Sequence, residues 1–153
     1  MSSQITIRPI LLQDHIEWSA LWKGYNAFYG REGASALPED VIRTTWDRLI
    51  SKAEPIHGLV AEAEGRLVGL AHIIFHRNTI HIKDTCYLQD VYTEVEYRGR
   101  GVARQLVEAV YEVCRARDVT SVYWHTHASN TAARALYDKL ATNTDFLVYR
   151  AKA

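Results

Sequence analysis

The chain has 153 residues, close to the usual size of one domain, so we expect a single domain over residues 1–153. Its 18 acidic and 18 basic residues balance, which argues against a nucleic-acid partner and against an acidic interaction tail. No apolar run approaches the roughly 20 residues that span a bilayer, and the N-terminus lacks the pattern of a secretory leader. We therefore expect a cytoplasmic protein with no membrane partner.

The first third of the sequence predicts a strand followed by two helices. Residues 5–10 have the pattern of a short strand, and apolar side chains then recur at helical spacing over residues 16–29. Gly30 follows that helix at a position suited to ending it. Pro38 opens the second helix, whose apolar stripe covers residues 41–50.

The middle of the sequence predicts three antiparallel strands and the most regular helix of the chain. The strands cover residues 59–63, 67–76 and 79–95, with turns between them. From Gly101 onward the period becomes helical, with charged residues on the opposite side. The apolar side of this helix consists of Val102, Leu106, Val107, Val110, Val113 and Cys114.

The last third predicts a strand at residues 119–125, a helix at 130–140 and a final strand at 146–150. The complete order is β-α-α-β-β-β-α-β-α-β. This order predicts an α/β fold with a mixed sheet that is mostly antiparallel and has helices on its faces. The unit over residues 88–125 should be a right-handed crossover whose two strands are parallel.

A loop rich in glycine and arginine joins the long strand to the regular helix. Its residues are Arg98, Gly99, Arg100, Gly101, Val102, Ala103 and Arg104. Glycine permits a tight turn and lets a ligand approach the backbone amides. The helix that begins there adds unsatisfied N–H groups and about half a unit of positive charge, and arginines favour phosphate. The loop predicts an anion site, with a plain glycine turn and solvated arginines as the alternative.

Two known nucleotide-binding motifs do not fit this loop. A dinucleotide-binding turn needs a third glycine or alanine where Arg104 stands, and a Walker loop ends in Gly-Lys-Ser/Thr. The pattern that does fit is Arg/Gln-x-x-Gly-x-Gly/Ala, which is filled by Arg98, Gly101 and Ala103.

Through this loop the chain resembles the GCN5-related N-acetyltransferases, the GNAT superfamily. A second motif carries the resemblance: Ser129-Asn130 followed by Ala133, Leu136 and Tyr137. The predicted element order also agrees with that fold over nearly the whole chain. The runs at residues 86–92 and 136–150 are most similar to the yeast Hpa-type acetyltransferase branch, and diamine acetyltransferases are a more distant likeness.

The resemblance implies that acetyl-CoA is the co-substrate. The amides of residues 98–104 would hold its pyrophosphate. The preceding strand would pair with its pantetheine arm through Val91, Tyr92 and Thr93. Asn130 would contact the pantetheine or a bound water.

Attack of an amine on a thioester needs a neutral nitrogen and a leaving thiolate that can be protonated. The resemblance assigns Tyr137 to protonation of the departing CoA sulfur, which makes it the predicted catalytic acid. Tyr137 lies seven residues after Asn130, so both project from one helix face, roughly 10 Å apart. The alternative for Tyr137 is a core tyrosine packed beside Leu136 and Leu140.

The catalytic base is less clearly indicated. Where related proteins read Leu-Glu-Asp, this chain reads Leu88-Gln89-Asp90, and glutamine cannot accept the proton. Asp90 is the nearby carboxylate and the predicted base, with a buried Asp90 that caps local backbone groups as the alternative. Strand alternation places Gln89 and Asp90 on opposite faces unless a bulge re-aims them.

We expect the acceptor amine near the end of the first helix. Aromatic residues gather there with a glutamate after them, and aromatic faces suit an ammonium group. A histidine after the fifth strand has two alternative roles, proton relay or hydrogen-bonded support of its loop. The predicted acceptor residues are Tyr25, Tyr29, Glu32, Gln89 and His127.

Neither a metal nor a cysteine nucleophile is indicated. No spacing among the histidines and cysteines matches a zinc site. Cys86 and Cys114 fall in apolar segments, so both are expected to be inert core thiols. Direct attack in a ternary complex of enzyme, acetyl-CoA and amine is therefore the predicted mechanism.

The predicted function is an acetyl-CoA-dependent N-acetyltransferase that acts on the primary amine of a small molecule. One alternative is a protein-lysine acetyltransferase of the histone type. Another is a CoA-binding module without turnover, suggested by Gln89. A homodimer is also predicted, because the apolar strand at residues 146–149 ends the sequence with little to cover its edge. Proteins of the resembling branch often associate through such strands.

Overall fold

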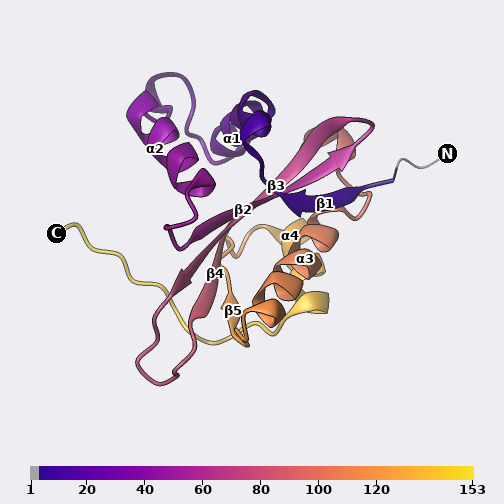
Figure 1. Cartoon of the computed structure of the whole chain (residues 1–153). Helices are drawn as coiled ribbons and strands as arrows, with labels where there is room; N and C mark the ends of the chain where they lie inside the picture. The colour runs from indigo at the N-terminus through magenta and orange to yellow at the C-terminus, as the bar shows by residue number, and fades with distance from the viewer. Residues whose placement is uncertain (1–3) are drawn as a thin grey trace.

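The computed structural model describes residues 4–153, and within them one five-stranded sheet carries helices on both faces (Figure 1). The strands are β1 (Thr6–Pro9), β2 (Ile56–Ala63), β3 (Arg66–His76), β4 (Thr85–Thr93) and β5 (Val122–Tyr123). The helices are α1 (His15–Phe28), α2 (Glu39–Ile50), α3 (Val102–Ala116) and α4 (Thr131–Leu140). The short 3-10 turns are η1 (Leu12–Asp14), η2 (Gly33–Ser35) and η3 (Val95–Tyr97). No helix in residues 4–153 combines the length and apolarity needed to cross a bilayer.

The order of strands in the sheet follows their order along the chain, from β1 to β5. Neighbours from β1 to β4 are antiparallel, and β4 pairs with β5 in parallel after the connection through α3. The predicted α/β fold with one parallel pair is therefore confirmed. Helix α3 packs on one face of the sheet, whereas α1 and α2 pack on β3 and β2 from the other face (Figure 1).

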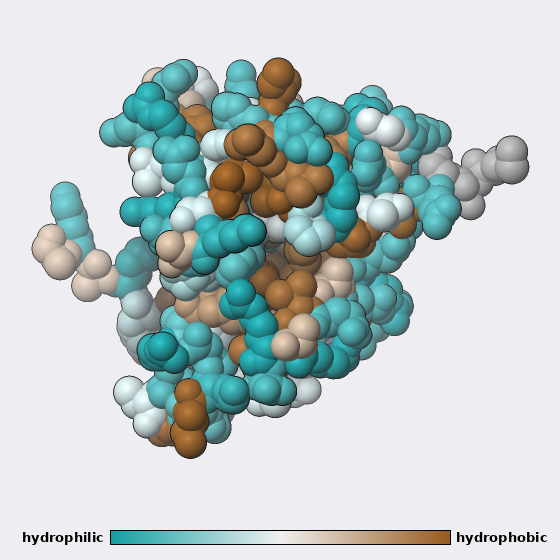
Figure 2. Space-filling model, in the orientation of Figure 1, coloured by the Kyte–Doolittle hydropathy of each residue, from teal (hydrophilic) through white to brown (hydrophobic). Residues whose placement is uncertain are grey.

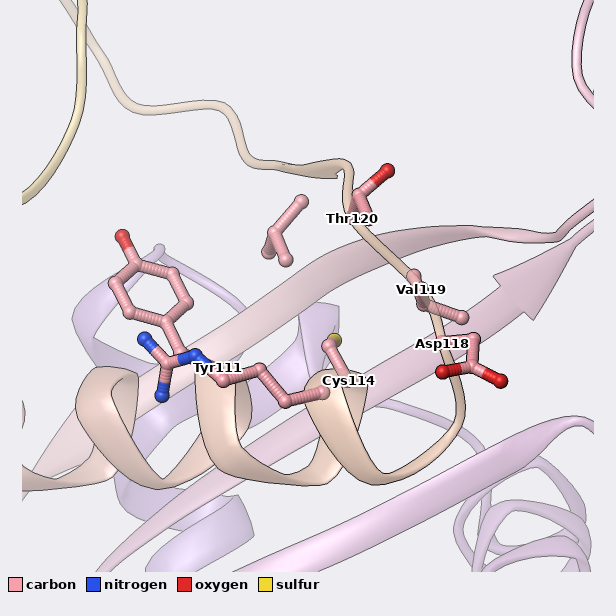
Figure 3. Close-up of a pocket in the computed structure, with 7 residues that line it drawn as sticks. Tyr111, Cys114, Asp118, Val119 and Thr120 are labelled. Atoms are coloured by element: carbon pink, nitrogen blue, oxygen red, sulfur yellow. The ribbon is translucent and has the colours of Figure 1, made fainter.

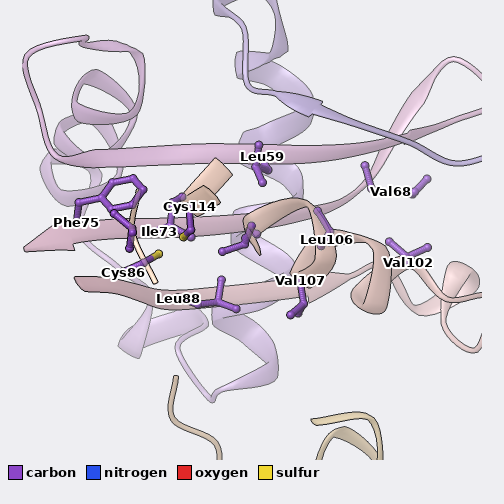
Figure 4. Close-up of a cluster of buried hydrophobic side chains, with 14 of the residues drawn as sticks. Leu59, Val68, Ile73, Phe75, Cys86, Leu88, Val102, Leu106, Val107 and Cys114 are labelled. Atoms are coloured by element: carbon purple, nitrogen blue, oxygen red, sulfur yellow. The ribbon is translucent and has the colours of Figure 1, made fainter. Parts of the chain in front are cut away.

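Under α3 lies a largely apolar core, the α3-side core (Figure 4). Its buried members are Leu59, Ala61, Ala63, Val68, Ala71, Ile73, Phe75, Cys86, Leu88, Tyr97, Val102, Leu106, Val107, Val110, Cys114 and Val119. Full burial of a leucine or valine side chain stabilises the fold by about 1.5–3 kcal/mol. Gly69 allows α3 to approach β3, since a Cβ there would lie 3.0 Å from Val102 Cγ1 and 2.9 Å from the Tyr92 backbone oxygen.

Under α1 and α2 lies a second, more aromatic core, the α1-side core. Its buried members are Trp18, Leu21, Trp22, Tyr25, Trp46, Leu49, Val60, Leu67 and Leu70. Trp18 of α1 meets Trp46 of α2 with ring centroids 5.1 Å apart, which joins the two helices. The buried ring of His72 on β3 also packs against this core, so the core contains the two polar nitrogen atoms of an imidazole.

The strand β4 is shorter than predicted. It begins at Thr85, and residues 79–84, predicted as its first part, form the β3–β4 loop instead. Asn78 turns the chain there, because its Oδ1 accepts a hydrogen bond from Ile80 N–H at 2.9 Å. The loop, which forms the lower end of the molecule in the orientation of Figures 1 and 2, leaves the side chains of Ile80 and Ile82 exposed.

The final strand predicted at residues 146–150 does not form. After α4 the chain leaves the sheet and runs outward to the C-terminus (yellow in Figure 1). The apolar side chains of this segment are 64–90% exposed: Phe146, Leu147, Val148 and Tyr149. A strand forms only beside a neighbour that takes its backbone hydrogen bonds, and no strand within residues 4–153 pairs with this segment.

Candidate functional site

A bulge in β4 decides which side chain points to which face of the sheet. Across from β3, His72 pairs with Asp90 and Ile73 pairs with Leu88, so Gln89 is the extra residue. Leu88 accordingly lies in the α3-side core, while Asp90 lies against His72 on the α1 side. Gln89 is exposed and Asp90 is buried. The bulge thus turns the only carboxylate of this segment toward α1.

Three buried side chains form a hydrogen-bonded series, the Trp18–His72–Asp90 chain. Trp18 Nε1 donates to His72 Nε2 at 3.0 Å, and His72 Nδ1 lies 2.9 Å from Asp90 Oδ2. An indole N–H can only donate, so Nε2 of His72 accepts and Nδ1 carries the hydrogen. The Nδ1–H group then donates to Asp90, which holds the carboxylate as an acceptor. Asp90 of β4 is therefore hydrogen-bonded to the side chain of His72 on β3.

Two tyrosines at the end of α1 lie beside Asp90. The hydroxyl of buried Tyr25 lies near the carboxylate of Asp90, and the ring of Tyr29 lies 4.9 Å from that of Tyr25. Burial, and then the negative charge of Asp90, raise the pKa of Tyr25 above its usual value of 10.0. The same two causes raise the pKa of Tyr29, while Arg31 opposes them. Both hydroxyls therefore keep their hydrogens at neutral pH.

Tyr137 reaches the same region from α4. Its ring meets that of Trp124 edge-on, with centroids 5.4 Å apart. Burial, and then the electrostatic effect of Tyr29, raise the pKa of Tyr137 above its usual value of 10.0. A raised pKa keeps the hydroxyl protonated at neutral pH, as a proton donor requires. Tyr29 also packs 5.9 Å from the ring of His127, and it lies within electrostatic reach of both Tyr137 and Asp90.

The remaining predicted residues are placed differently. Asn130 is the N-cap of α4, and its Oδ1 accepts from Ala133 N–H at 3.3 Å. Its side-chain carbonyl therefore serves the helix, and its amide nitrogen is the part left for a ligand. Glu32 and Gln89 are exposed and lie outside the hydrogen-bonded group around Asp90.

The glycine loop has the backbone that an anion site needs. Gly99 and Gly101 have φ values of 76° and 82°, in the left-handed region that other residues rarely adopt. Gly101 is the N-cap of α3 and no side chain caps this helix end. The first backbone bond into the helix runs from Gln105 N–H to Gly101 O at 3.0 Å. The amides of residues 102–104 are thus left to face a ligand.

The three arginines of the loop take different positions. Arg98 Nε donates to Thr93 O at 3.1 Å, and its guanidinium lies over the rings of Phe28 and Tyr92. Arg100 stacks over Tyr97, 4.8 Å from the ring centroid, and Arg104 pairs with Glu108 on the next turn of α3. Of these three arginines, only Arg98 is therefore directed toward β4 and Phe28 at the end of α1.

Strands β4 and β5 separate after Tyr87 and Tyr123. They pair only at Cys86 with Val122 and at Tyr87 with Tyr123, so β5 is shorter than the strand predicted at residues 119–125. Beyond that point the edge of β4 over residues 88–93 has no strand beside it in residues 4–153. The buried Thr93 hydroxyl has no hydrogen-bond partner in the same part of the chain. An open strand edge with unpaired polar groups suits an extended ligand arm.

Two cavities of about 490 and 540 Å³ lie along α3, and neither is lined by Asp90 or Tyr137. Figure 3 shows the first, between the end of α3 and the chain that leads into β5. Its lining residues are Tyr111, Cys114, Arg115, Asp118, Val119, Thr120 and Val122. The predicted chemistry uses none of them.

The two cysteines do not belong to the site. Cys86 and Cys114 are free, buried and close to each other, and burial raises the pKa of both thiols. A buried thiol with a raised pKa is a poor nucleophile, which agrees with the prediction of two inert core thiols. No group of three or more metal-binding side chains is found in residues 4–153.

Sequence reasoning missed three residues of this site. His72 and Trp18 were not predicted because their hydrogen bonds are long-range in sequence. His72 and Asp90 are 18 positions apart, and Trp18 and His72 are 54 positions apart. A lone histidine inside the apolar run of β3 was the available signal, since a buried imidazole needs partners. Arg31 was also missed, although it directly follows the aromatic cluster at the end of α1.

Comparison with known proteins identifies relatives of the whole chain. The model of the acetyltransferase (GNAT) family matches residues 18–141. The D-amino-acid N-acetyltransferase HPA3 of Saccharomyces cerevisiae is 31% identical over 152 residues, which cover 98% of this chain and 92% of that protein.

Solved structures share the fold at lower identity. The aminoglycoside N-acetyltransferase AAC(6')-Iy in complex with CoA has a TM-score of 0.82 and 20% identity, covering 99% of this chain and 97% of that one. A ribosomal-protein-alanine N-acetyltransferase from Brucella melitensis biovar Abortus 2308 has a TM-score of 0.76 and 17% identity, covering 98% and 100%.

Proposed function

The chain belongs to the GNAT family of N-acetyltransferases, and from that premise we propose that it acetylates the primary amine of a small molecule by direct attack on acetyl-CoA in a ternary complex. The observation that carries this proposal is that Tyr29 lies within electrostatic reach of both a hydrogen-bonded carboxylate, Asp90, and a protonated phenol, Tyr137. These are the two groups that proton transfer to and from the reacting atoms requires.

The site fits acetyl-CoA through its backbone. The free amides of residues 102–104 and the guanidinium of Arg98 suit the pyrophosphate. The open edge of β4 at Val91 and Thr93 suits the pantetheine arm, with the unpaired Thr93 hydroxyl beside it. The amide nitrogen of Asn130 suits a carbonyl of that arm. Acetyl-CoA supplies the activated acetyl group when bound.

The residues of the chain then move two protons. An alkylamine is neutral only about once in 10³ molecules at pH 7, which withholds roughly 4 kcal/mol unless a base helps. Asp90, directly or through an ordered water, takes that proton while the nitrogen attacks the thioester carbon. The carbon–sulfur bond breaks, and Tyr137 donates its hydroxyl proton to the departing sulfur. The products are the N-acetyl amide and CoA with a free thiol.

The position of Gln89 bears on the alternative of a CoA-binding module without turnover. That alternative rests on glutamine standing where related proteins have glutamate. Because of the bulge, Gln89 is exposed while Asp90 faces His72 and Tyr25, so the chain keeps a carboxylate on the side of the acceptor tyrosines. This arrangement favours an enzyme.

Small molecules are favoured as acceptors by the relatives. HPA3 is named for D-amino acids, and AAC(6')-Iy is named for aminoglycosides. The Brucella neighbour is named for a ribosomal protein, so the fold alone does not choose between small and protein acceptors. A protein-lysine acetyltransferase is therefore the alternative within the family. Cytoplasmic location stays a prediction from the sequence.

Two measurements test the proposal together. CoA at 100 times its dissociation constant should stabilise the fold by about 2.7 kcal/mol, seen as a rise in Tm. Free thiol should be released from acetyl-CoA in the presence of small amines and not with lysine-containing peptides. Release with peptides alone would favour the protein acceptor, and binding without release would favour the module.

A matched pair of variants controls the CoA measurement. Gly101→Glu places a carboxylate in the loop, so it should abolish the CoA-dependent rise in Tm. Gly65→Glu is the control, because Gly65 has a similar φ of 76° and open space but lies in the β2–β3 turn. It adds the same charge and similar strain, so it should keep the rise. An equal response of both variants would contradict the loop as the CoA site.

We also propose that the protein is a homodimer that uses residues 146–149. These residues are exposed and apolar, and β5 is an edge strand on the side away from β4. Pairing with a second copy would give the segment the neighbour that it lacks in one chain. Light scattering should give twice the monomer mass at micromolar concentration. A monomer mass would overturn this proposal.

A further inference from the structure

Arg31 is held against the two tyrosines that flank Asp90. Its Nε donates to Asn26 Oδ1 at 2.7 Å, and buried Asn26 is itself fixed by its Nδ2, which donates to Trp22 O at 2.8 Å. The guanidinium carbon lies 5.8 Å from the ring centroid of Tyr25 and 5.6 Å from that of Tyr29. The cation is therefore positioned by groups on α1 that do not neutralise it.

The terminal nitrogens of Arg31 have no protein partner. No carboxylate within residues 4–153 lies at ion-pair distance from it, and only its Nε makes a hydrogen bond. Other arginines of the chain differ: Arg8, Arg66 and Arg104 each pair with a carboxylate. A guanidinium with free Nη1 and Nη2 groups presents the planar fork that binds a carboxylate through two hydrogen bonds.

Arg31 and Asp90 bring opposite charges to the same two tyrosines, Tyr25 and Tyr29. Asp90 raises the pKa of both Tyr25 and Tyr29, whereas Arg31 lowers the pKa of both. Both charges therefore act on the same pair of hydroxyls, yet they form no ion pair with each other anywhere in the described chain. A ligand that lies between them meets an anion on one side and a cation on the other.

Resting on the proposed function, we infer that Arg31 binds the carboxylate of an α-amino acid acceptor whose amine faces Asp90. An α-amino acid carries its amino group and its carboxylate on the same carbon atom. Its amine can therefore face Asp90 while its carboxylate faces Arg31. A polyamine would bring a second cation to Arg31 and be repelled. A lysine side chain within a protein has no carboxylate near its amine. Arg31 is thus the residue that selects among primary amines.

A purely structural Arg31 would act differently. Through Asn26 and the tyrosine rings it would only hold the end of α1, and its loss would then weaken every acceptor alike. A residue that binds the carboxylate distinguishes acceptors that differ only in that group. The test therefore compares an amino acid with its carboxamide, using both enantiomers because the side chain takes a different direction in each.

The experiment uses Arg31→Gln, with Arg43→Gln on the exposed surface of α2 as the control. Calorimetry in the presence of CoA measures acceptor binding, and thiol release from acetyl-CoA measures kcat/KM. For the parent and for Arg43→Gln, at least one enantiomer should be preferred over its carboxamide by about 10²-fold in both measurements. For Arg31→Gln the preference should fall to within about threefold, with the carboxamide values unchanged.

The two readouts separate this inference from the proposed function. A binding preference that Arg31→Gln removes, without thiol release from any amine, would uphold Arg31 and refute the acetyltransfer. Thiol release without a preference in the parent, a preference that survives in Arg31→Gln, or an equal loss for acid and carboxamide would each overturn the role of Arg31.

Discussion

Both faces of the sheet bury an apolar core, but the two cores contain different kinds of side chain. Under α3 the buried residues are mainly aliphatic, with two thiols among them. Under α1 the sheet buries the Trp18–His72–Asp90 chain beside Tyr25. Neighbouring residues of one strand serve both faces, since Ile73 lies in the α3-side core and His72 packs against Trp18. Of these two faces, the α1 side holds Asp90 and Tyr25, residues to which the proposed function gives a role.

The polar groups buried on the α1 side are tolerated because they are paired. Burying an imidazole and a carboxylate is costly unless each finds a hydrogen-bond partner. Trp18 supplies the hydrogen-bond partner of His72, and His72 supplies the partner of Asp90. Asp90 is consequently held in one orientation by side chains from a helix and a neighbouring strand. A catalytic carboxylate requires that kind of support.

The largest effect is expected at Tyr137, as a loss of activity without a matching loss of stability. Tyr137→Phe removes the hydroxyl but keeps the ring against Trp124. The turnover number should fall about 10²- to 10⁴-fold, while Tm and CoA affinity scarcely change. Steady-state kinetics, thermal melts and CoA titrations measure these three quantities.

The alkaline side of the pH profile provides a second readout for Tyr137. Burial raises its pKa above 10.0, so the acid form persists and kcat of the parent should not decline between neutral pH and that value. If Tyr137 had only a structural role, Tyr137→Phe would lose stability and not activity. The rate would then stay within threefold, and stability would fall by about 1 kcal/mol.

In the α3-side core we expect the reverse, a loss of stability without a matching loss of activity. Leu106 is fully buried in the α3-side core, and Leu106→Ala should lower the free energy of unfolding by about 2–5 kcal/mol. At a temperature where the variant is folded, kcat should stay within about threefold of the parent. Urea unfolding and kinetics on the same sample measure both. Leu106→Met, which conserves volume, is the control and should cost less than about 1.5 kcal/mol.

Asp90→Asn should lower kcat/KM by about 10²-fold with little change in Tm. Asparagine keeps the shape of the side chain and can still accept from His72 Nδ1–H, so the packing is preserved. The measurement is a pH–rate profile of parent and variant. The part of the pH–rate profile that depends on ionisation of the catalytic base should be lost in the variant. If it remains, the base is water, His125 or His127 and not Asp90.

The smallest effect is expected at Trp18, where one buried donor is removed. Trp18→Phe leaves His72 Nε2 without its partner, which should cost about 1–3 kcal/mol of stability and lower kcat by less than tenfold. Trp46→Phe is the matched control, because Trp46 lies in the same core and makes no hydrogen bond within residues 4–153. If both variants lose kcat equally, the Trp18–His72–Asp90 chain does not position Asp90.

Much of the fold follows from local sequence. The helical period from Val102 to Cys114 predicts α3, and Gly99 and Gly101 predict a turn that only glycine adopts easily. The spacing of Asn130 and Tyr137 predicts one helix, and α4 contains it. These features depend on residues a few positions apart, so a single sequence is sufficient to derive them.

Only the tertiary structure decided how the site is assembled. The bulge at Gln89 arises from the pairing of β4 with β3, and it turns Asp90 toward His72. The bond from Trp18 to His72 joins residues 54 positions apart. The predicted strand at residues 146–150 does not form for the same kind of reason, because no strand within residues 4–153 pairs with it. Local periodicity is set by adjacent residues, whereas register and buried hydrogen bonds are set by partners that the folded chain brings together.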